Sequence, residues 1–467
     1  MGMSNMRLLL SVLSFCLLAM PAAAAEPTSC AELTRGRDLP CTINFAGYRY
    51  DTPAVTKPIR TRMVRSAAEL NALEYQPGDE IILANGPWSD ARINVQANGT
   101  AVAPIIIRGE TPSGVTFTGT SAAQFSGSYI TLRDIAFRNG LVREDTGIVL
   151  KLGAGLNRPC GHCRAERVTI DNFNPAPRDW EKLKTFYIAA QGESITIENS
   201  TFTNKQNVGG IVIAPDPNDG FCDRGKQQCV QRLIFRNNRI SSVSKDVRHG
   251  RLEAGKFVAM QIGGSRTVTA PSFSIIEGNQ FEHIDGGTNT LAIKVSDIII
   301  RDNRFTDNLG TIDLRATNRA LVMNNTFDGT AKPGMGGIDV TGRGHWIVRN
   351  VFRNLLDPIN DFHIPISMPA SEDEELRDGS NRYARPRDVV IADNTFDNIS
   401  RPAIALGVFP KGGARTLMPA DIYLVDNTFR FAGQAARAMG NDDGLIKFIG
   451  PRDRFANIRV VNNRVER

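Results

Sequence analysis

The sequence predicts an all-β protein that folds as a single right-handed parallel β-helix, a solenoid in which each coil of chain stacks on the one before it. Three observations predict this fold. A motif of Asn, any residue and Phe recurs along the chain, its copies lie about one coil apart, and β-forming runs precede them. The composition agrees, because 41% hydrophobic and 22% charged residues permit a large core and exclude a disordered chain.

The repeat sets the length of a coil. Clear copies of the motif begin at Asn279, Asn303, Asn325, Asn350, Asn394 and Asn427, and weaker copies at Asn199, Asn238 and Asn463. From Phe281 the first steps between Phe residues are 24, 22 and 25 residues long (281 to 305 to 327 to 352). Such steps are too short for a propeller blade, and no leucine-rich consensus is present. Three short strands and their turns fit this length.

Within each coil the motif has an expected structural role. We expect the Asn to occupy a left-handed turn and to hydrogen-bond to the Asn of the next coil. The Phe rings should stack in the core at the strand spacing of roughly 4.8 Å. The Asn and Phe residues are therefore interpreted as structural.

The ends and loops complete the predicted solenoid. Ser66 and Glu69 form a capping box, which predicts a short helix that caps the first coil. Long irregular segments interrupt the repeat, and loops from a rigid solenoid usually build its groove. These segments are 141–174, 215–229, 241–271, 357–387 and 410–419.

The N-terminus resembles an export signal. Residues 1–25 contain Arg7, an apolar run and a small-residue cleavage site, so we expect a signal peptide followed by a β-helix catalytic domain over residues 26–467. No other stretch is apolar for long enough to span a membrane. The expected location is therefore periplasmic or secreted, and we expect a monomer.

Six cysteines remain after the signal, and an even number in an oxidising compartment favours disulfides. Pairing of sequence neighbours is the simplest arrangement, and it gives Cys30–Cys41, Cys160–Cys163 and Cys222–Cys229. The Cys-Gly-His-Cys stretch at 160–163 leaves a redox or zinc role open, although no thioredoxin-like pattern surrounds it.

The charge balance restricts the partners. The formal net charge is only +6, and no basic cluster with interleaved aromatic residues is present. Nucleic acid is therefore not an expected partner, whereas an acidic substrate in a local basic cleft is.

Two cations define the candidate chemistry. Lys294 and Arg315 are 21 residues apart (294 to 315), close to one coil, so both should lie on one face of adjacent coils. Two like charges at that separation depress the pKa of the lysine, which suits a catalytic base. A pair of solvated surface cations is the alternative.

Several motifs resemble the polysaccharide lyase family that contains alginate lyases and chondroitinase B. The resemblance spans roughly residues 65–354. It rests on Tyr75–Gly86, Asn98–Thr100, Pro104-Ile105, Phe117–Gly119, Leu314-Arg315, Gly336–Ile338 and Gly344–Asn350. It implies β-elimination on a uronic-acid polysaccharide, alginate being the first expectation. It also implies that Lys294 removes the C5 proton and that Arg315 assists the departing O4.

Departures from the family pattern affect the binding residues. Many members bind Ca²⁺ through two glutamates shortly before the lysine, but here that stretch is 286–290 and includes Asn289, so no cofactor is assigned and Ca²⁺ remains only possible. Gln261 replaces a frequent arginine, and Asp339 stands where the family often has a cation. We expect Gln261, Asn289 and Asp339 to contact substrate, and Arg266 or Lys256 to neutralise its carboxylate.

One histidine is a further candidate, and two other functions remain open. His345 lies at a coil boundary and is expected to bind sugar, with a purely structural turn histidine as the alternative. The departures also permit a non-catalytic β-helix that binds an acidic polysaccharide. A uronate C5-epimerase would share the proton abstraction.

Overall fold

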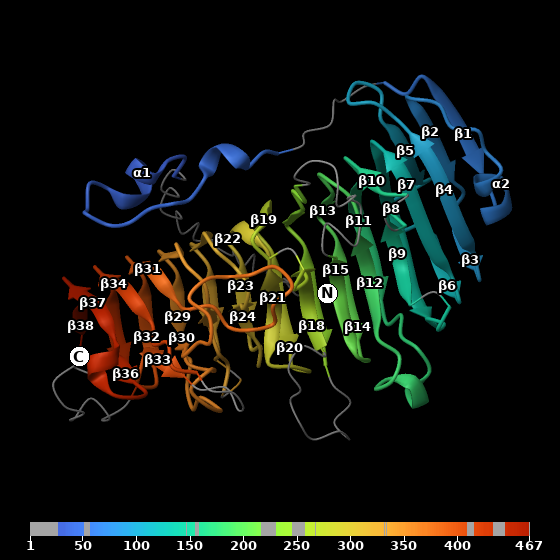
Figure 1. Cartoon of the computed structure of the whole chain (residues 1–467). Helices are drawn as coiled ribbons and strands as arrows, with labels where there is room; N and C mark the ends of the chain where they lie inside the picture. The colour runs from blue at the N-terminus through green and yellow to red at the C-terminus, as the bar shows by residue number, and fades with distance from the viewer. Residues whose placement is uncertain are drawn as a thin grey trace, which may run out of the picture.

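The protein is a parallel β-helix in this computed structural model. The described residues are 27–50, 57–145, 147–154, 158–215, 230–244, 257–266, 268–330, 332, 334–408, 415–432 and 444–466. The coils stack along one axis, and every pairing between its named strands is parallel (Figure 1). None of the helices in these ranges is both long and apolar enough to cross a membrane. The predicted fold class is confirmed.

The strands form two sheets along the solenoid. The 13-stranded sheet presents the face that carries the candidate site. Its strands are β4 (Arg92–Asn98), β7 (Ala122–Ser128), β9 (Ile148–Leu152), β10 (Cys160–Gly161), β12 (Thr185–Ala190), β15 (Gly209–Ala214), β18 (Phe257–Gly263), β21 (Asn289–Lys294), β24 (Thr311–Leu314), β27 (Ile338–Val340), β30 (Ile366–Pro369), β33 (Ile404–Val408) and β36 (Ile446–Phe448).

The 25-stranded sheet covers the remaining sides, because most coils contribute two strands to it. Its strands are β1 (Arg60–Val64), β2 (Asp79–Leu83), β3 (Gly86–Ser89), β5 (Ile105–Gly109), β6 (Val115–Gly119), β8 (Ile130–Gly140), β11 (Arg164–Asp171), β13 (Thr196–Glu198), β14 (Thr201–Lys205), β16 (Ile234–Arg236), β17 (Arg239–Val243), β19 (Pro271–Glu277), β20 (Gln280–Ile284), β22 (Ser296–Arg301), β23 (Arg304–Thr306), β25 (Ala320–Met323), β26 (Thr326–Asp328), β28 (Trp346–Val348), β29 (Val351–Arg353), β31 (Arg387–Ala392), β32 (Thr395–Ile399), β34 (Ala420–Val425), β35 (Thr428–Phe431), β37 (Ala456–Val461) and β38 (Arg464–Glu466).

The Asn-x-Phe motif builds the corner between paired strands of this larger sheet. Phe305 and Phe327 are each 1% exposed and stack with their ring centroids 4.8 Å apart. Asn303 Nδ2 donates to Asn325 Oδ1 at 3.0 Å, and the same contact recurs from coil to coil. The predicted ladder of Asn and stack of Phe are therefore present.

The left-handed turn lies one residue earlier than we expected. Asp302 and Asn324, which precede the ladder residues Asn303 and Asn325, have φ of 55° each, whereas the two ladder residues are not in the left-handed region. The reason is that the ladder Asn must point its amide into the corner, so the preceding residue makes the turn and takes the positive φ.

A short helix caps the first coils as predicted. Helix α2 (Ala67–Asn71) begins at Ser66, whose side chain accepts a hydrogen bond from the Glu69 amide, while Glu69 accepts one from the amide of Arg65. Leu70 is fully buried in the solenoid core. Asn71 also donates to the carbonyl of Arg92 at 2.7 Å, which attaches α2 to the open edge of β4.

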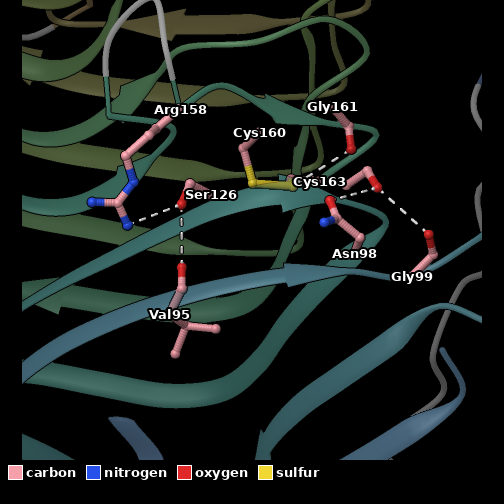
Figure 2. Close-up of a disulfide and its surroundings, with 9 residues drawn as sticks. Val95, Asn98, Gly99, Ser126, Arg158, Cys160, Gly161 and Cys163 are labelled. Carbon is pink, nitrogen blue, oxygen red and sulfur yellow. Dashed lines mark hydrogen bonds between the residues drawn. A yellow bond between two sulfur atoms is a disulfide. The ribbon is translucent and has the colours of Figure 1, made fainter. Parts of the chain in front are cut away.

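Two of the three predicted disulfides lie in described segments, and both form. Cys160 and Cys163 are joined, at most 1% exposed, beside the strand that carries Ser126 (Figure 2). Burial favours the structural interpretation of this Cys-Gly-His-Cys loop over a redox one. Cys30 pairs with Cys41. Cys222 and Cys229 lie outside the described residues.

The segment 27–50 lies against the C-terminal coils, although it precedes the first coil in sequence (Figure 1). It contains α1 (Cys30–Thr34) and the 3-10 helix η1 (Phe45–Gly47); η2 (Pro177–Asp179) and η5 (Arg452–Arg454) occur elsewhere. Leu33 and Ile43 pack on outward-facing apolar side chains that include Trp346. The indole of Trp346 donates to the carbonyl of Pro40 at 2.9 Å. The sequence analysis did not predict this strap.

Candidate functional site

Strands β21, β24 and β27 place the candidate residues on one outer face. Ala292 pairs with Asp313, and Asp313 with Asp339. The register continues beyond these pairs, because the Ala316 amide donates to the carbonyl of residue 293. Lys294 therefore lies beside Arg315, about 4.8 Å away along the sheet. Because side chains alternate along a strand, both cations share the outward face with the two aspartates.

Lys294 has the environment of an amine that can accept a proton. Its ammonium group has no hydrogen bond or ion pair with any described residue. Burial lowers its pKa, and the positive charge of Arg315 lowers the pKa further. Asp313 acts in the opposite direction, and Lys184 adds to the lowering. The net effect increases the fraction of neutral amine near pH 7.

Arg315 offers its guanidinium to the same space. It lies 5.2 Å from the centroid of the Tyr383 ring and has no hydrogen bond from its side chain to the described part of the chain. Arg415 approaches the Tyr383 ring to 4.0 Å and is held by Glu372, whose carboxylate accepts from Nε at 2.7 Å. Arg415 therefore holds the Tyr383 ring in place at one side of the cleft. The N–H groups of Arg315 remain available to donate hydrogen bonds to a substrate.

Asp313 and Asp339 form a pair of stacked carboxyl groups. Asp313 accepts from Asn289 Nδ2 at 2.8 Å, and Asp339 accepts from the hydroxyls of Thr311, at 2.8 Å, and Ser367. Neither forms an ion pair within the described ranges. Burial raises the pKa of Asp313 to about 6, and burial together with the charge of Asp313 raises the pKa of Asp339 to about 8. The pair therefore retains a proton near pH 7.

Arg315, Asp313 and Asp339 line a cleft of about 190 Å³, and Lys294 lies next to Arg315 on the same outer face. Its walls also include residues from the segment 357–387, among them His363 and Tyr383. Sequence reasoning missed both, because that segment has no repeat to fix its position. Asp313 was also missed, although alternation along the strand from Arg315 could have identified it.

The other predicted residues fall in different places. Asn289 lines the cleft, as does Asp339, and Gln261 faces outward one coil before Ala292. Arg266 is exposed on the loop after β18, and Lys256 lies outside the described residues. His345 is not in the cleft: it is fully buried, and both ring nitrogens bond to backbone groups, the Ala320 amide and the Thr341 carbonyl.

The residues near Asn289 do not fit a calcium site. Its amide oxygen accepts from Thr288, and its amide nitrogen donates to Asp313. Asp285, the nearest carboxylate in sequence, is bound to Lys332. Across the described ranges, no three His, Cys, Asp or Glu side chains are grouped so as to hold a metal. Calcium prefers several oxygen ligands in one shell, and this donor set does not supply them.

The comparisons with known proteins agree with this architecture. The sequence model of the chondroitinase B family matches residues 64–409, which include the whole cleft. The chain belongs to that family. The predicted family is therefore confirmed. A comparison with curated proteins gave no match.

Solved structures of family members share the fold. The alginate lyase AlyGC of polysaccharide lyase family 6 is 22% identical, with a TM-score of 0.69 over 85% of this chain and 50% of that one. This chain thus spans about half of AlyGC. A mannuronic-acid-specific family 6 lyase from human gut microbiota is 19% identical (TM-score 0.69, covering 85% and 92%). A family 6 lyase from Pseudopedobacter saltans is also 19% identical (TM-score 0.68, covering 87% and 92%).

Proposed function

We propose that this protein is a polysaccharide lyase that cleaves a uronic-acid polysaccharide, alginate, by β-elimination. The observation that carries the proposal is the pair of neighbouring cations, Lys294 and Arg315, beside one cleft. Neither side chain has a hydrogen bond or an ion pair with any described residue. Membership of the chondroitinase B family supports it. The alginate lyases among the similar structures support the choice of substrate.

Lys294 is the proposed base. Its neutral amine takes the proton from C5 of the uronate, which is weakly acidic because a carboxylate is attached to the same carbon. The lowered pKa increases the fraction of Lys294 that is neutral and able to accept this proton. The amine must approach C5 from the sheet, which places the ring across β21 and β24.

Arg315 is proposed to stabilise the charge that develops. As the C5–H bond breaks, its electrons form the C4=C5 double bond, and the C4–O4 bond breaks with its electrons going to O4. Arg315 donates hydrogen bonds to the departing O4 and to the carboxylate, and O4 is then protonated by water. Because the Arg315 side chain has no hydrogen bond or ion pair with any described residue, its donors can serve this role.

The sequence suggests the setting of this reaction. We propose that residues 1–25 are removed on export, that residues 26–467 form one catalytic domain, and that the enzyme acts as a monomer in the periplasm or outside the cell. The two disulfides support an oxidising compartment. The acidic polysaccharide is then the only partner that the mechanism needs.

One panel of substrates tests the function. Mature protein is incubated with polymannuronate, polyguluronate and dermatan sulfate, and ultraviolet absorbance of the new double bond, chain length and binding are recorded. Unsaturated, shortened product from either alginate polymer is expected. Binding without shortening would indicate a non-catalytic protein instead, and an altered uronate without a double bond would indicate an epimerase.

Calcium dependence is measured in the same assay. Because the residues around Asn289 do not fit a calcium site, a chelator should leave the turnover unchanged. Loss of turnover in chelator, restored by Ca²⁺, would contradict this expectation.

A further inference from the structure

The cleft has two chemically different ends. Arg315, the residue after β24, lies at the cation end with Lys294 beside it, and Asp313 lies two residues earlier within β24, about 7 Å away. Asn289 and His363 line the cleft together with Asp313. The cleft therefore changes from hydrogen-bond donors to acceptors across roughly two strand residues, which is comparable with the width of one sugar ring.

The acceptor end contains oxygen atoms that can accept more hydrogen bonds than the described residues donate to them. Asp313 Oδ2 accepts from Asn289, but the other oxygen of this carboxylate has no hydrogen bond to any described residue. Asp339, its register partner, accepts only from the hydroxyls of Thr311 and Ser367. No cation pairs with either carboxyl group in the described segments. Free acceptors beside a cleft select ligands that donate hydrogen bonds.

His363 is an acceptor as well. Its Nδ1 lies 3.0 Å from Asn360 Oδ1, and since an amide oxygen only accepts, Nδ1 carries the proton. The lone pair is then on Nε2, which is buried and has no partner in the described residues, in a side chain only 3% exposed. Burial lowers the pKa of His363 to about 4, so the ring is neutral at pH 7.

The local backbone fixes this histidine at the cleft. Gly336 precedes β27, and a Cβ there would lie 3.0 Å from the Cα of His363 and 2.5 Å from the Thr311 side chain. Only glycine permits this close approach of the segment 357–387 to the sheet. The unsatisfied Nε2 is costly to bury, which indicates that a ligand completes it.

Resting on the proposed function, we infer that Asp313, Asp339 and His363 bind the free 2- and 3-hydroxyls of the uronate ring and select against chains esterified there. In a uronate ring the C5 carboxylate and the C2–C3 edge lie on opposite sides. A ring with C5 above Lys294 and its carboxylate toward Arg315 therefore turns its two hydroxyls toward the acceptors.

Esterification of the 2- and 3-hydroxyls removes each of these hydrogen bonds. An O-acetyl group removes the hydroxyl proton, so the lone pair of His363 and the free oxygen of Asp313 would be buried without a donor. A sulfate ester would also bring a negative charge against the carboxylate of Asp313, whose pKa of about 6 leaves it ionised at pH 7. A site built to receive a hydroxyl discriminates strongly against an analogue that lacks it, because its own polar groups are left unpaired.

The test compares one polymer in two forms. Initial rates are measured on O-acetylated polymannuronate and on the same sample after mild alkaline de-esterification. The unesterified form should have a kcat/KM higher by roughly a hundredfold. Equal values for the two forms would overturn the inference.

Variants assign the selectivity to the acceptor end. His363→Leu should lower kcat/KM on the unesterified polymer by roughly tenfold and reduce the ratio between the two forms, whereas His363→Gln retains an acceptor and most of the ratio. His283→Leu, at an exposed position on β20, is the matched control and should change neither value. A ratio that His363→Leu leaves intact would contradict the assignment.

A binding measurement separates this inference from the proposed function. Calorimetry with the Lys294→Met variant compares unesterified and O-acetylated mannuronate trisaccharides, with thermal melts confirming that each variant is folded. Tighter binding of the unesterified form supports the inference even if the wild type cleaves neither polymer, in which case only the lyase proposal fails. Equal binding of the two forms overturns the inference even if cleavage is observed.

Discussion

Two regions of the solenoid use the same coil spacing in opposite ways. One is the Asn corner, where the ladder asparagines stack. The other is the outer face that carries Lys294, Arg315, Asp313 and Asp339, here called the cleft floor. At the corner, identical neighbours stabilise each other: Asn325 Nδ2 donates to Asn350 Oδ1, and its own Oδ1 accepts from Asn303. On the cleft floor the neighbours are alike in charge, Lys294 beside Arg315. A solenoid places equivalent positions of adjacent coils side by side, so this pair of like charges lowers stability, as residues retained for a function often do.

The packing shows the same contrast. Phe281, Phe305 and Phe327 stack at 4.8 to 4.9 Å with nearly parallel rings. Asp313 and Asp339 lie at the same strand spacing, but there the charge of Asp313 raises the pKa of Asp339 instead. We therefore expect substitutions at the corner to change mainly the stability of the fold, and substitutions of the cations on the cleft floor to change mainly the activity. Four substitutions, each with a control variant, test this division.

The largest effect is expected at the floor. Lys294→Met should lower kcat by roughly 10²–10⁴-fold, the usual contribution of a general base, while the free energy of unfolding stays equal or rises because a charge repulsion is removed. Lys151→Met, on the same outer face at β9, is the control and should retain activity. Full activity of Lys294→Met, measured by double-bond absorbance, would remove Lys294 from the mechanism.

The corner should respond in stability instead. Phe327→Ala removes a ring from the middle of the stack and should cost about 3–5 kcal/mol of unfolding free energy, measured by urea denaturation. Thr326→Ala, at the preceding half-buried position, should cost much less. If the two variants were equally stable, the stack would not be the stabilising element that we describe.

The ladder should show a slightly smaller loss. Asn325→Ala removes the oxygen that accepts from the backbone N–H of Asn303 and the amide nitrogen that donates to the carbonyl of Ile300. Both groups are buried, so we expect a loss of about 3 kcal/mol. Asn324→Gly changes the residue that has the positive φ and should be nearly neutral, because glycine adopts this conformation freely. The opposite order of effects would place the structural role on the turn residue.

The smallest expected effect is a pH-dependent change in stability at Asp339. The pKa of Asp339 in the folded state is raised to about 8 by burial and by Asp313, above its unfolded value of about 4. Its protonated form therefore favours folding, and this stability is lost as the pH rises from about 4 to about 8. Asp339→Asn should match the wild type at low pH and melt about 2–5 °C higher at pH 8.

Asp328 supplies a control of opposite sign. Burial acts to raise its pKa, but hydrogen bonds from Thr330 and Arg353 outweigh burial and hold the pKa at about 2. Its ionised form therefore favours folding above about pH 4. Asp328→Asn should lower the melting temperature at pH 8 and have little effect at pH 2. The same sign for both variants would contradict the electrostatic account of the cleft floor.

How much the sequence predicted depends on whether a residue lies within the repeat. The coil length, the Asn ladder and the alignment of Lys294 with Arg315 follow from counting residues, because one coil converts sequence spacing into distance. The predicted position of the left-handed turn was wrong by one residue. The pattern of Asn marks the corner but does not distinguish the residue that turns from the one that bonds.

The amino-acid sequence was enough to predict the solenoid, its capping helix, the two described disulfides and the cation pair, because each joins residues that are close in sequence or one coil apart. Where the non-repeating segments dock follows only from the folded structure. It placed Tyr383 and His363 at the cleft, and laid the strap 27–50 on the C-terminal coils. These contacts join segments with no common spacing, so nothing in a local pattern encodes them.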